Sequence, residues 1–187
     1  MLTFAARLGV TEPSTRRGSR SMVFPVGPNE EERLRALLET GILDTASDPA
    51  FDAVTAEARK HFGVPMCLVT LIDRDRQWIK SAQGVCIPET PRDIAFCNYT
   101  ILSDEVFVVE DALADERFRD NPAVTGELGI RFYAGAPLIY MKNIRLGALC
   151  LLDTKPRTFS RGDRAELLFF ADRIVAEIAA REFNRIP

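Results

Sequence analysis

The sequence predicts an α+β domain: an antiparallel β-sheet with helices packed against it, the N-terminal and C-terminal helices pairing on one face. Two observations predict this class. Two pairs of short apolar runs are each joined by a short polar turn, and segments with helical spacing of apolar residues stand at both ends of the chain. With 187 residues, 47% of them hydrophobic, the chain suits one domain with a core. We expect that domain at residues 29–184, after a flexible tail at 1–28 and before a short tail at 185–187.

Two helices are predicted before the first strand. Asn29 is a favourable N-cap and Gly41 a typical stop, which predicts a helix over residues 30–40. Asp48 is followed by a proline and begins a second helix, which Gly63 ends. Apolar residues in both segments recur at helical spacing, so each helix has one face for the core.

A strand pair and a third helix follow. Residues 66–72 form an apolar run too short for a helix, which predicts a strand covered on both faces. Residues 77–82 return as its partner after a turn. Thr90 then resembles an N-cap before a proline, and we expect a helix over residues 92–102.

The second half of the chain centres on a hairpin. A short strand at residues 106–109 leads into a polar stretch, residues 110–129, and a loop of that length is usually functional. In the hairpin that follows, Gly135 and Gly147 mark close backbone approaches or bulges. Ser160 caps a long final helix.

Charge and motifs exclude several classes of function. The net charge of −3 gives no basic stripe for a general nucleic-acid binder. No apolar run reaches membrane-spanning length and the start lacks a signal peptide, so we expect a cytoplasmic protein that binds no membrane. The cysteines show no zinc-type spacing, and no catalytic triad or phosphate loop is present. The sequence therefore identifies no metal, no cofactor and no catalytic residue.

A set of short motifs resembles the GAF domain family, small sensor modules of bacterial signalling proteins. The match runs from about Glu31 to Ala180 and is closest to GAF domains placed ahead of histidine kinase or diguanylate cyclase modules. The motifs are Gly41 to Thr45, Phe51-Asp52, Val69 to Asp73 with Gln77-Trp78, Phe96-Cys97, Asp111-Ala112 with Asp115 and Arg117-Phe118, Asn121-Pro122, Arg131 to Leu138, and Leu146 to Cys150 with Asp153.

The resemblance implies a function in signal transduction without catalysis. It implies a small-molecule pocket between the sheet and its overlying loops, and a homodimer formed through the terminal helices. Phe169 and Phe170 widen the apolar face of the last helix and favour self-association. Since no output domain follows residue 187, signalling would pass to a separate protein such as a kinase or cyclase, or through the oligomer.

The candidate ligand-binding residues lie in the long loop, the hairpin and the third helix, and would converge on one cavity. The competing interpretation is that the loop's charged residues only tie it to the sheet by ion pairs and caps. The candidates are Phe96, Cys97, Asp111, Arg117, Phe118, Asn121, Arg131 and Tyr133.

Two other functions stay open beside the sensor. Cys86 and Cys97 are spaced as in the free methionine-(R)-sulfoxide reductases, which are GAF-fold enzymes, but residues 110–129 lack the further cysteine that those enzymes carry. A degenerate GAF fold could also serve only as an assembly surface. A haem or bilin is not favoured: His61 suits a helix C-terminus, and Asn98 to Thr100 lack the histidine that usually follows a bilin cysteine.

Overall fold

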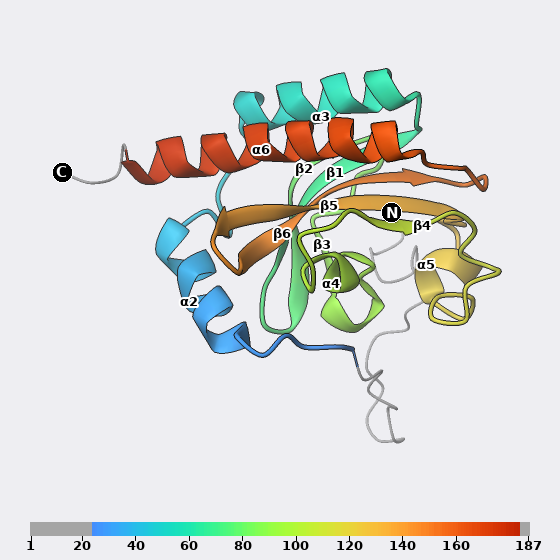
Figure 1. Ribbon diagram of the computed structural model, residues 1–187, viewed down its shortest axis with the longest axis horizontal. Helices are drawn as coiled ribbons and strands as arrows, with labels where there is room; N and C mark the ends of the chain where they lie inside the picture. Colours follow the sequence, from blue (N-terminus) through green and yellow to red (C-terminus); the bar gives the residue numbers. More distant parts are fainter. Residues whose placement is uncertain (1–23, 184–187) are drawn as a thin grey trace, which may run out of the picture.

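The computed structural model describes residues 24–183. Most of the expected N-terminal tail, residues 1–23, lies outside the described residues, as do residue 184 and the expected C-terminal tail at 185–187. It contains a six-stranded antiparallel sheet in the order β3-β2-β1-β6-β5-β4, which confirms the predicted fold class (Figure 1). The strands are β1 (Met66–Ile72), β2 (Arg76–Gln83), β3 (Glu89–Pro91), β4 (Phe107–Val109), β5 (Phe132–Met141) and β6 (Ile144–Asp153).

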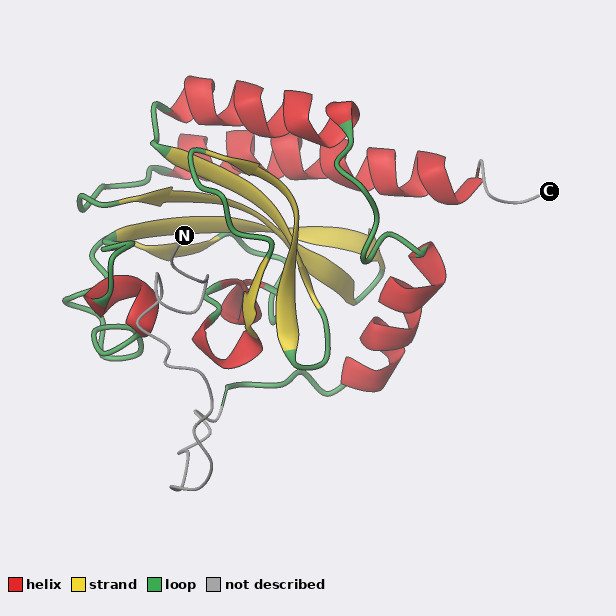
Figure 2. Ribbon diagram, turned by 180° about the vertical axis from the view of Figure 1, so that it is seen from behind, coloured by secondary structure: helices red, strands yellow, loops and turns green. Residues whose placement is uncertain are grey.

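Long helices cover one face of the sheet and short ones the other. Helices α3 (Pro49–Phe62) and α6 (Arg161–Phe183) run side by side over the first face, and α2 (Glu30–Thr40) packs at its end (Figures 1 and 2). The opposite face carries the 3-10 turn η1 (Arg92–Ile94), α4 (Cys97–Thr100) and α5 (Pro122–Thr125) (Figure 1). None of the helices within residues 24–183 has the length and apolar character that crossing a membrane requires.

The sheet separates two apolar cores, and β1 contributes to both. Cys67, Val69 and Leu71 pack among side chains of the long helices, whereas Leu68 and Ile72 belong to the core beneath the short helices. Strand side chains alternate between the two faces of a sheet. Since both faces are covered here, all seven residues of β1 are buried. The predicted strand covered on both faces is confirmed.

The helix signals in the sequence mostly act as predicted. Gly41 and Gly63 end α2 and α3 in the left-handed conformation, each with φ of 59°. The Asp48 side chain accepts a hydrogen bond of 2.8 Å from the Ala50 amide. Asn29 differs: it makes no side-chain cap, and its side-chain Nδ2 donates to the Asn143 backbone carbonyl at 2.6 Å. A tertiary contact has replaced the local one.

The predicted helix over residues 92–102 is wrong. Ala95 is extended, with φ of −78° and ψ of 120°, so the segment divides into η1 and the single turn α4. Thr90 does not cap a helix, because it lies in β3, which pairs with β2. The Arg92 amide donates to the Asp75 carbonyl at 3.1 Å, so sheet pairing sets the start of this segment.

Two glycines allow the close approaches that the sequence predicted. A Cβ atom at Gly147 would lie 1.9 Å from the Thr70 carbonyl oxygen of the neighbouring strand. At Gly135 it would lie 2.1 Å from the Tyr133 hydroxyl oxygen and 2.6 Å from the Thr100 hydroxyl oxygen. Gly135 therefore makes room for a polar contact beneath the short helices.

Candidate functional site

A cavity of about 70 Å³ lies between the sheet and the segment that carries η1, α4 and α5. Strands β1, β2, β5 and β6 form its floor, and none of the charged side chains within residues 24–183 lines it. Its volume is about half that of an engineered apolar cavity of about 150 Å³ that binds benzene. The lining includes Leu68, Ile79, Ile94, Phe96, Cys97, Leu128, Tyr133 and Cys150.

A stack of three aromatic rings fills the space beside the cavity. Phe118, from the long loop, stacks on Phe96 with ring centroids 4.1 Å apart and 9° between the planes. Phe96 in turn stacks on Tyr133 of β5 at 5.2 Å. All three side chains are buried. The protein's own rings thus occupy much of the volume between the loop and the sheet, so the remaining space admits only a small molecule.

One polar group in the cavity wall has no partner. Gln77 of β2 is 9% exposed, and its Nε2 donates to the Thr90 hydroxyl at 3.1 Å. Its Oε1 atom is buried and accepts no hydrogen bond from any of the residues that the structure describes. Both side chains line the cavity. Since an unpaired buried acceptor costs free energy, a ligand that donates a hydrogen bond here would be stabilised.

Two thiols and a phenol meet at another part of the wall. The Tyr133 hydroxyl lies 2.7 Å from Thr100 Oγ1 and donates to Cys97 Sγ at 3.2 Å, and Cys97 Sγ lies 3.8 Å from Cys150 Sγ. Burial opposes ionisation of Cys97, but hydrogen bonds from Cys150, Thr70 and Tyr133 lower its pKa below the ordinary value. Burial, followed by the neighbouring Cys97, raises the pKa of Tyr133.

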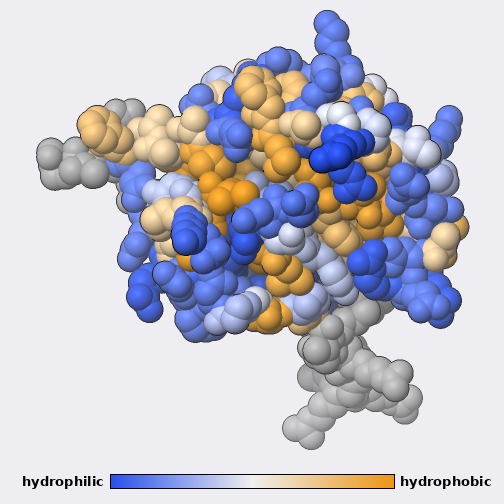
Figure 3. Space-filling model, in the orientation of Figure 1, coloured by the Kyte–Doolittle hydropathy of each residue, from blue (hydrophilic) through white to orange (hydrophobic). Residues whose placement is uncertain are grey.

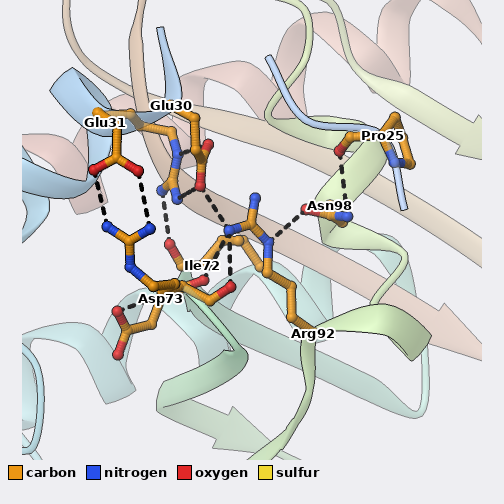
Figure 4. Close-up of polar contacts among 9 residues, drawn as sticks. Pro25, Glu30, Glu31, Ile72, Asp73, Arg92 and Asn98 are labelled. Atoms are coloured by element: carbon orange, nitrogen blue, oxygen red, sulfur yellow. Dashed lines mark hydrogen bonds and ion pairs between the residues drawn. The ribbon is translucent and has the colours of Figure 1, made fainter. Parts of the chain in front are cut away.

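A buried arginine connects the segment that contains η1 and α4 to helix α2 (Figure 4). Arg92 of η1 is 2% exposed; its Nη1 lies 2.6 Å from Glu30 Oε1, and its Nε donates to Asn98 Oδ1 at 2.9 Å. Glu30 also pairs with Arg33 at 2.8 Å. Burial opposes ionisation of Glu30, but hydrogen bonds from Arg33 and Arg92 lower its pKa to about 2. The Phe24 ring covers the Arg92 guanidinium at 4.8 Å, so residues directly before the domain also contact this group.

The eight predicted site residues do not all meet in one place. Three of them, Phe96, Cys97 and Tyr133, line the 70 Å³ cavity. Another three line a separate hollow of about 250 Å³ beside Phe24, and they are Arg117, Phe118 and Asn121. The remaining two, Asp111 and Arg131, line neither space.

The polar candidates Asp111, Asn121 and Arg131 make hydrogen bonds to the loop or to the neighbouring turn η1. Asp111 Oδ1 accepts from the Leu113 amide at 3.1 Å, and Arg131 Nη1 donates to the Val124 carbonyl at 2.9 Å. Asn121 caps α5 and donates to the Ile94 carbonyl at 2.9 Å. These contacts hold the loop over the sheet and position the walls of the cavity.

Four residues that sequence reasoning missed carry the polar chemistry: Gln77, Thr90, Arg92 and Cys150. Cys150 had a detectable signal, because it alternates along β6 with leucines that face the long helices. The other three acquire their roles only through the pairing of β3 with β2 and the docking of α2.

The other candidates for cofactor or redox chemistry, Cys86 and His61, do not line the cavity. Cys86 is exposed, whereas Cys97 is buried against Cys150. His61, at the end of α3, lies on the surface and pairs with Glu166 at 2.6 Å. Within residues 24–183, no three His, Cys, Asp or Glu side chains gather in a way that could hold a metal ion.

Comparison with known proteins places the chain in a family. The model of the GAF domain matches residues 47–178. A cyclic di-GMP phosphodiesterase of Pseudomonas aeruginosa is 42% identical over 159 residues; the match covers 84% of this chain and 27% of that protein, so the chain spans about a quarter of this curated relative.

Solved structures share the fold at low identity. The GAF domain of a phosphoenolpyruvate-protein phosphotransferase from Coxiella burnetii superimposes with a TM-score of 0.62, at 17% identity, over 89% of this chain and 98% of that one. The free methionine-R-sulfoxide reductase of Neisseria meningitidis, in complex with its substrate, gives 0.58 at 16% identity, over 90% and 100%. The order of strands, the helices on both faces and the family match together establish that this chain belongs to the GAF domain family.

Proposed function

We propose that this GAF domain is a non-enzymatic sensor or regulatory domain in signal transduction, which binds a small uncharged molecule in the 70 Å³ cavity. The observation that carries the proposal is an apolar cavity with one unpaired acceptor, Gln77 Oε1, buried in its wall. An ionised ligand would lose its hydration there without a countercharge. The preferred ligand is therefore neutral, smaller than benzene, and carries one hydrogen-bond donor.

Occupancy of the cavity would be transmitted to α2. Residues 94–97 line the cavity, and Arg92 and Asn98 flank them on either side. Arg92 holds Glu30 in the first turn of α2. A ligand that binds one position of this segment better than another would shift α2 by that difference in affinity.

A signalling partner and a homodimer complete the proposal. The relative in Pseudomonas aeruginosa is a cyclic di-GMP phosphodiesterase, which supports a protein or module of cyclic di-GMP signalling as the proposed partner of this domain. Phe170 of α6 packs into the core, but Phe169 is 63% exposed. Apolar side chains gather along and just below α6 on the face shown in Figure 3. We propose this helix, with α2, as the dimer contact.

Native mass spectrometry of the freshly purified chain tests the ligand. We expect an adduct of low mass on the folded wild-type protein that dissociates on unfolding. Ile79→Phe, which fills the cavity, removes the adduct, whereas Leu113→Phe at an exposed position retains it. The ligand proposal fails if both variants and the wild type show the bare mass, and if a set of neutral small molecules raises no melting temperature.

Light scattering tests the dimer separately. The wild type is expected at twice the chain mass. The Phe169→Ser dimer is expected to dissociate at a higher protein concentration than the dimer of the control Leu113→Ser. Both positions are exposed, but only Phe169 lies on α6. A monomeric wild type at all concentrations contradicts this part of the proposal.

An assay of methionine sulfoxide reduction tests the absence of catalysis. The expected result is no consumption of NADPH with thioredoxin, thioredoxin reductase and free methionine-(R)-sulfoxide, since Cys86 is exposed on a loop and Cys97 is buried against a different cysteine. Sustained turnover that Cys86→Ser abolishes would overturn the non-enzymatic assignment.

A further inference from the structure

We propose that Cys97 and Cys150 form a peroxide-reactive dithiol in the wall of the cavity, which a small hydroperoxide converts to a buried disulfide. The two Sγ atoms lie 3.8 Å apart, and each residue is 2% exposed. Cys97 begins α4 and Cys150 lies in the middle of β6, so the pair joins the segment above the cavity to the sheet below it. The inference does not require a resident ligand.

The geometry brings the sulfurs close to bonding distance. An S–S bond of about 2.05 Å requires the sulfurs to approach by roughly 1.8 Å. The two sides differ in their freedom to move. β6 pairs with β1 and β5 along its length, whereas α4 is a single turn between irregular segments. Rotation of both side chains, with a small shift of α4, supplies the approach.

The surroundings distinguish Cys97 from the other buried thiols. The Tyr133 hydroxyl points at its sulfur from 3.2 Å and donates a hydrogen bond that stabilises a thiolate. The hydrogen bonds around Cys97 lower its pKa despite burial, whereas burial raises the pKa of Cys67 to about 12. The thiolate is the reactive form of a cysteine. Cys97 is therefore the attacking sulfur and Cys150 the resolving one.

The cavity supplies the place for the oxidant. Cys97 and Cys150 both line it, and its volume of about 70 Å³ admits a molecule of a few heavy atoms. Hydrogen peroxide has two heavy atoms and carries no charge, so it fits a space of this size and loses less hydration free energy there than a charged oxidant would.

The reaction takes two steps. The Cys97 thiolate attacks one peroxide oxygen; the O–O bond breaks, Cys97 becomes a sulfenic acid, and the other oxygen leaves as hydroxide and takes up the proton that the thiol released. The Cys150 sulfur then attacks the Cys97 sulfur; the S–O bond breaks, the S–S bond forms, and water leaves with the Cys150 proton. Two thiols and one hydrogen peroxide thus give one disulfide and two waters.

Peptide mapping after peroxide treatment tests the proposal. The folded full chain is treated with hydrogen peroxide, alkylated in denaturant, digested and analysed by mass spectrometry with and without reductant. We expect one crosslinked peptide pair that contains Cys97 and Cys150 and separates on reduction. Free Cys97 and Cys150 after treatment, or a crosslink from Cys97 to Cys86, overturns the proposal.

Variants separate a built site from chance proximity. Cys150→Ala should leave Cys97 as a sulfenic acid that dimedone traps once the treated protein is unfolded in denaturant, and Cys67→Ala should leave the crosslink unchanged, since Cys67 lies in the other core. Tyr133→Phe keeps the ring but loses the hydroxyl, and should slow oxidation roughly three- to tenfold. If Cys67 oxidises as fast as Cys97 in the wild type, the reaction proceeds through unfolding and the proposal fails. The wild-type peptide map decides the result even if a variant does not fold.

Discussion

The Arg92 guanidinium lies 2.6 Å from the Glu30 carboxylate and directly connects the segment over the cavity to helix α2. The same nitrogen also donates to the Asp73 carbonyl at 3.0 Å. Arg92 therefore binds α2, the β1–β2 turn and Asn98 of α4 at once (Figure 4). A buried charge with this many partners fixes one arrangement of three elements.

Glu30→Gln should lower the free energy of unfolding by about 3 kcal/mol, because it leaves the buried Arg33 and Arg92 without their countercharge. Urea unfolding measures the loss. Glu31→Gln is the matched control: Glu31 stands in the same helical turn and pairs with Arg74 in solvent, so its loss should leave stability unchanged. Equal effects of the two substitutions would contradict the role given to Glu30.

The contribution of Glu30 should depend on pH. Its pKa is lowered from 4.5 to about 2 in the folded protein. A group whose folded pKa is depressed adds stability above its unfolded pKa and loses it as pH falls through the folded pKa. The stability difference between wild type and Glu30→Gln should be complete at about pH 6 and markedly smaller at about pH 3. Urea unfolding at both pH values checks this, and a constant difference would show that Glu30 is not the group that titrates.

Gly135→Ala should destabilise the protein by about 1–3 kcal/mol, because the added Cβ meets the Tyr133 and Thr100 hydroxyls. The displaced Tyr133 ring would also disturb the stack with Phe96. Gly162→Ala, in the first turn of α6, is the control, since its added Cβ would lie 3.6 Å from the nearest atom outside the helix backbone, Ser160 Oγ. Denaturant unfolding of both variants distinguishes them; an unaffected Gly135→Ala would mean that Tyr133 has space to move.

The fold was predictable because its signals are local. The two hairpins and the long helices follow from runs of apolar residues and from glycines and prolines at their ends, as at Gly41 and Gly63. The segment after Pro88 was not predictable in the same way. Thr90 and Pro91 are typical of a helix start, but pairing with β2 overrides that preference.

The site was predictable only in its apolar part. Phe96, Cys97 and Tyr133 belong to the motifs of the family and line the cavity. Arg117 instead pairs with Asp115 two residues away, at 2.9 Å between Nε and Oδ1, as the competing interpretation of the loop holds. The pairs Arg92–Glu30 and Cys97–Cys150 join residues 62 and 53 positions apart, and no local pattern marks such contacts.

Transmission of cavity occupancy to α2 is tested most directly by xenon binding followed by amide NMR. Xenon is an uncharged probe that binds apolar cavities. In the wild type we expect shifts at the cavity-lining residues 94–97 and at α2, residues 30–40. In Glu30→Gln the cavity shifts should remain and those in α2 should be lost. Shifts in α2 that are equal in both proteins, or no xenon shifts around the cavity, would contradict the account.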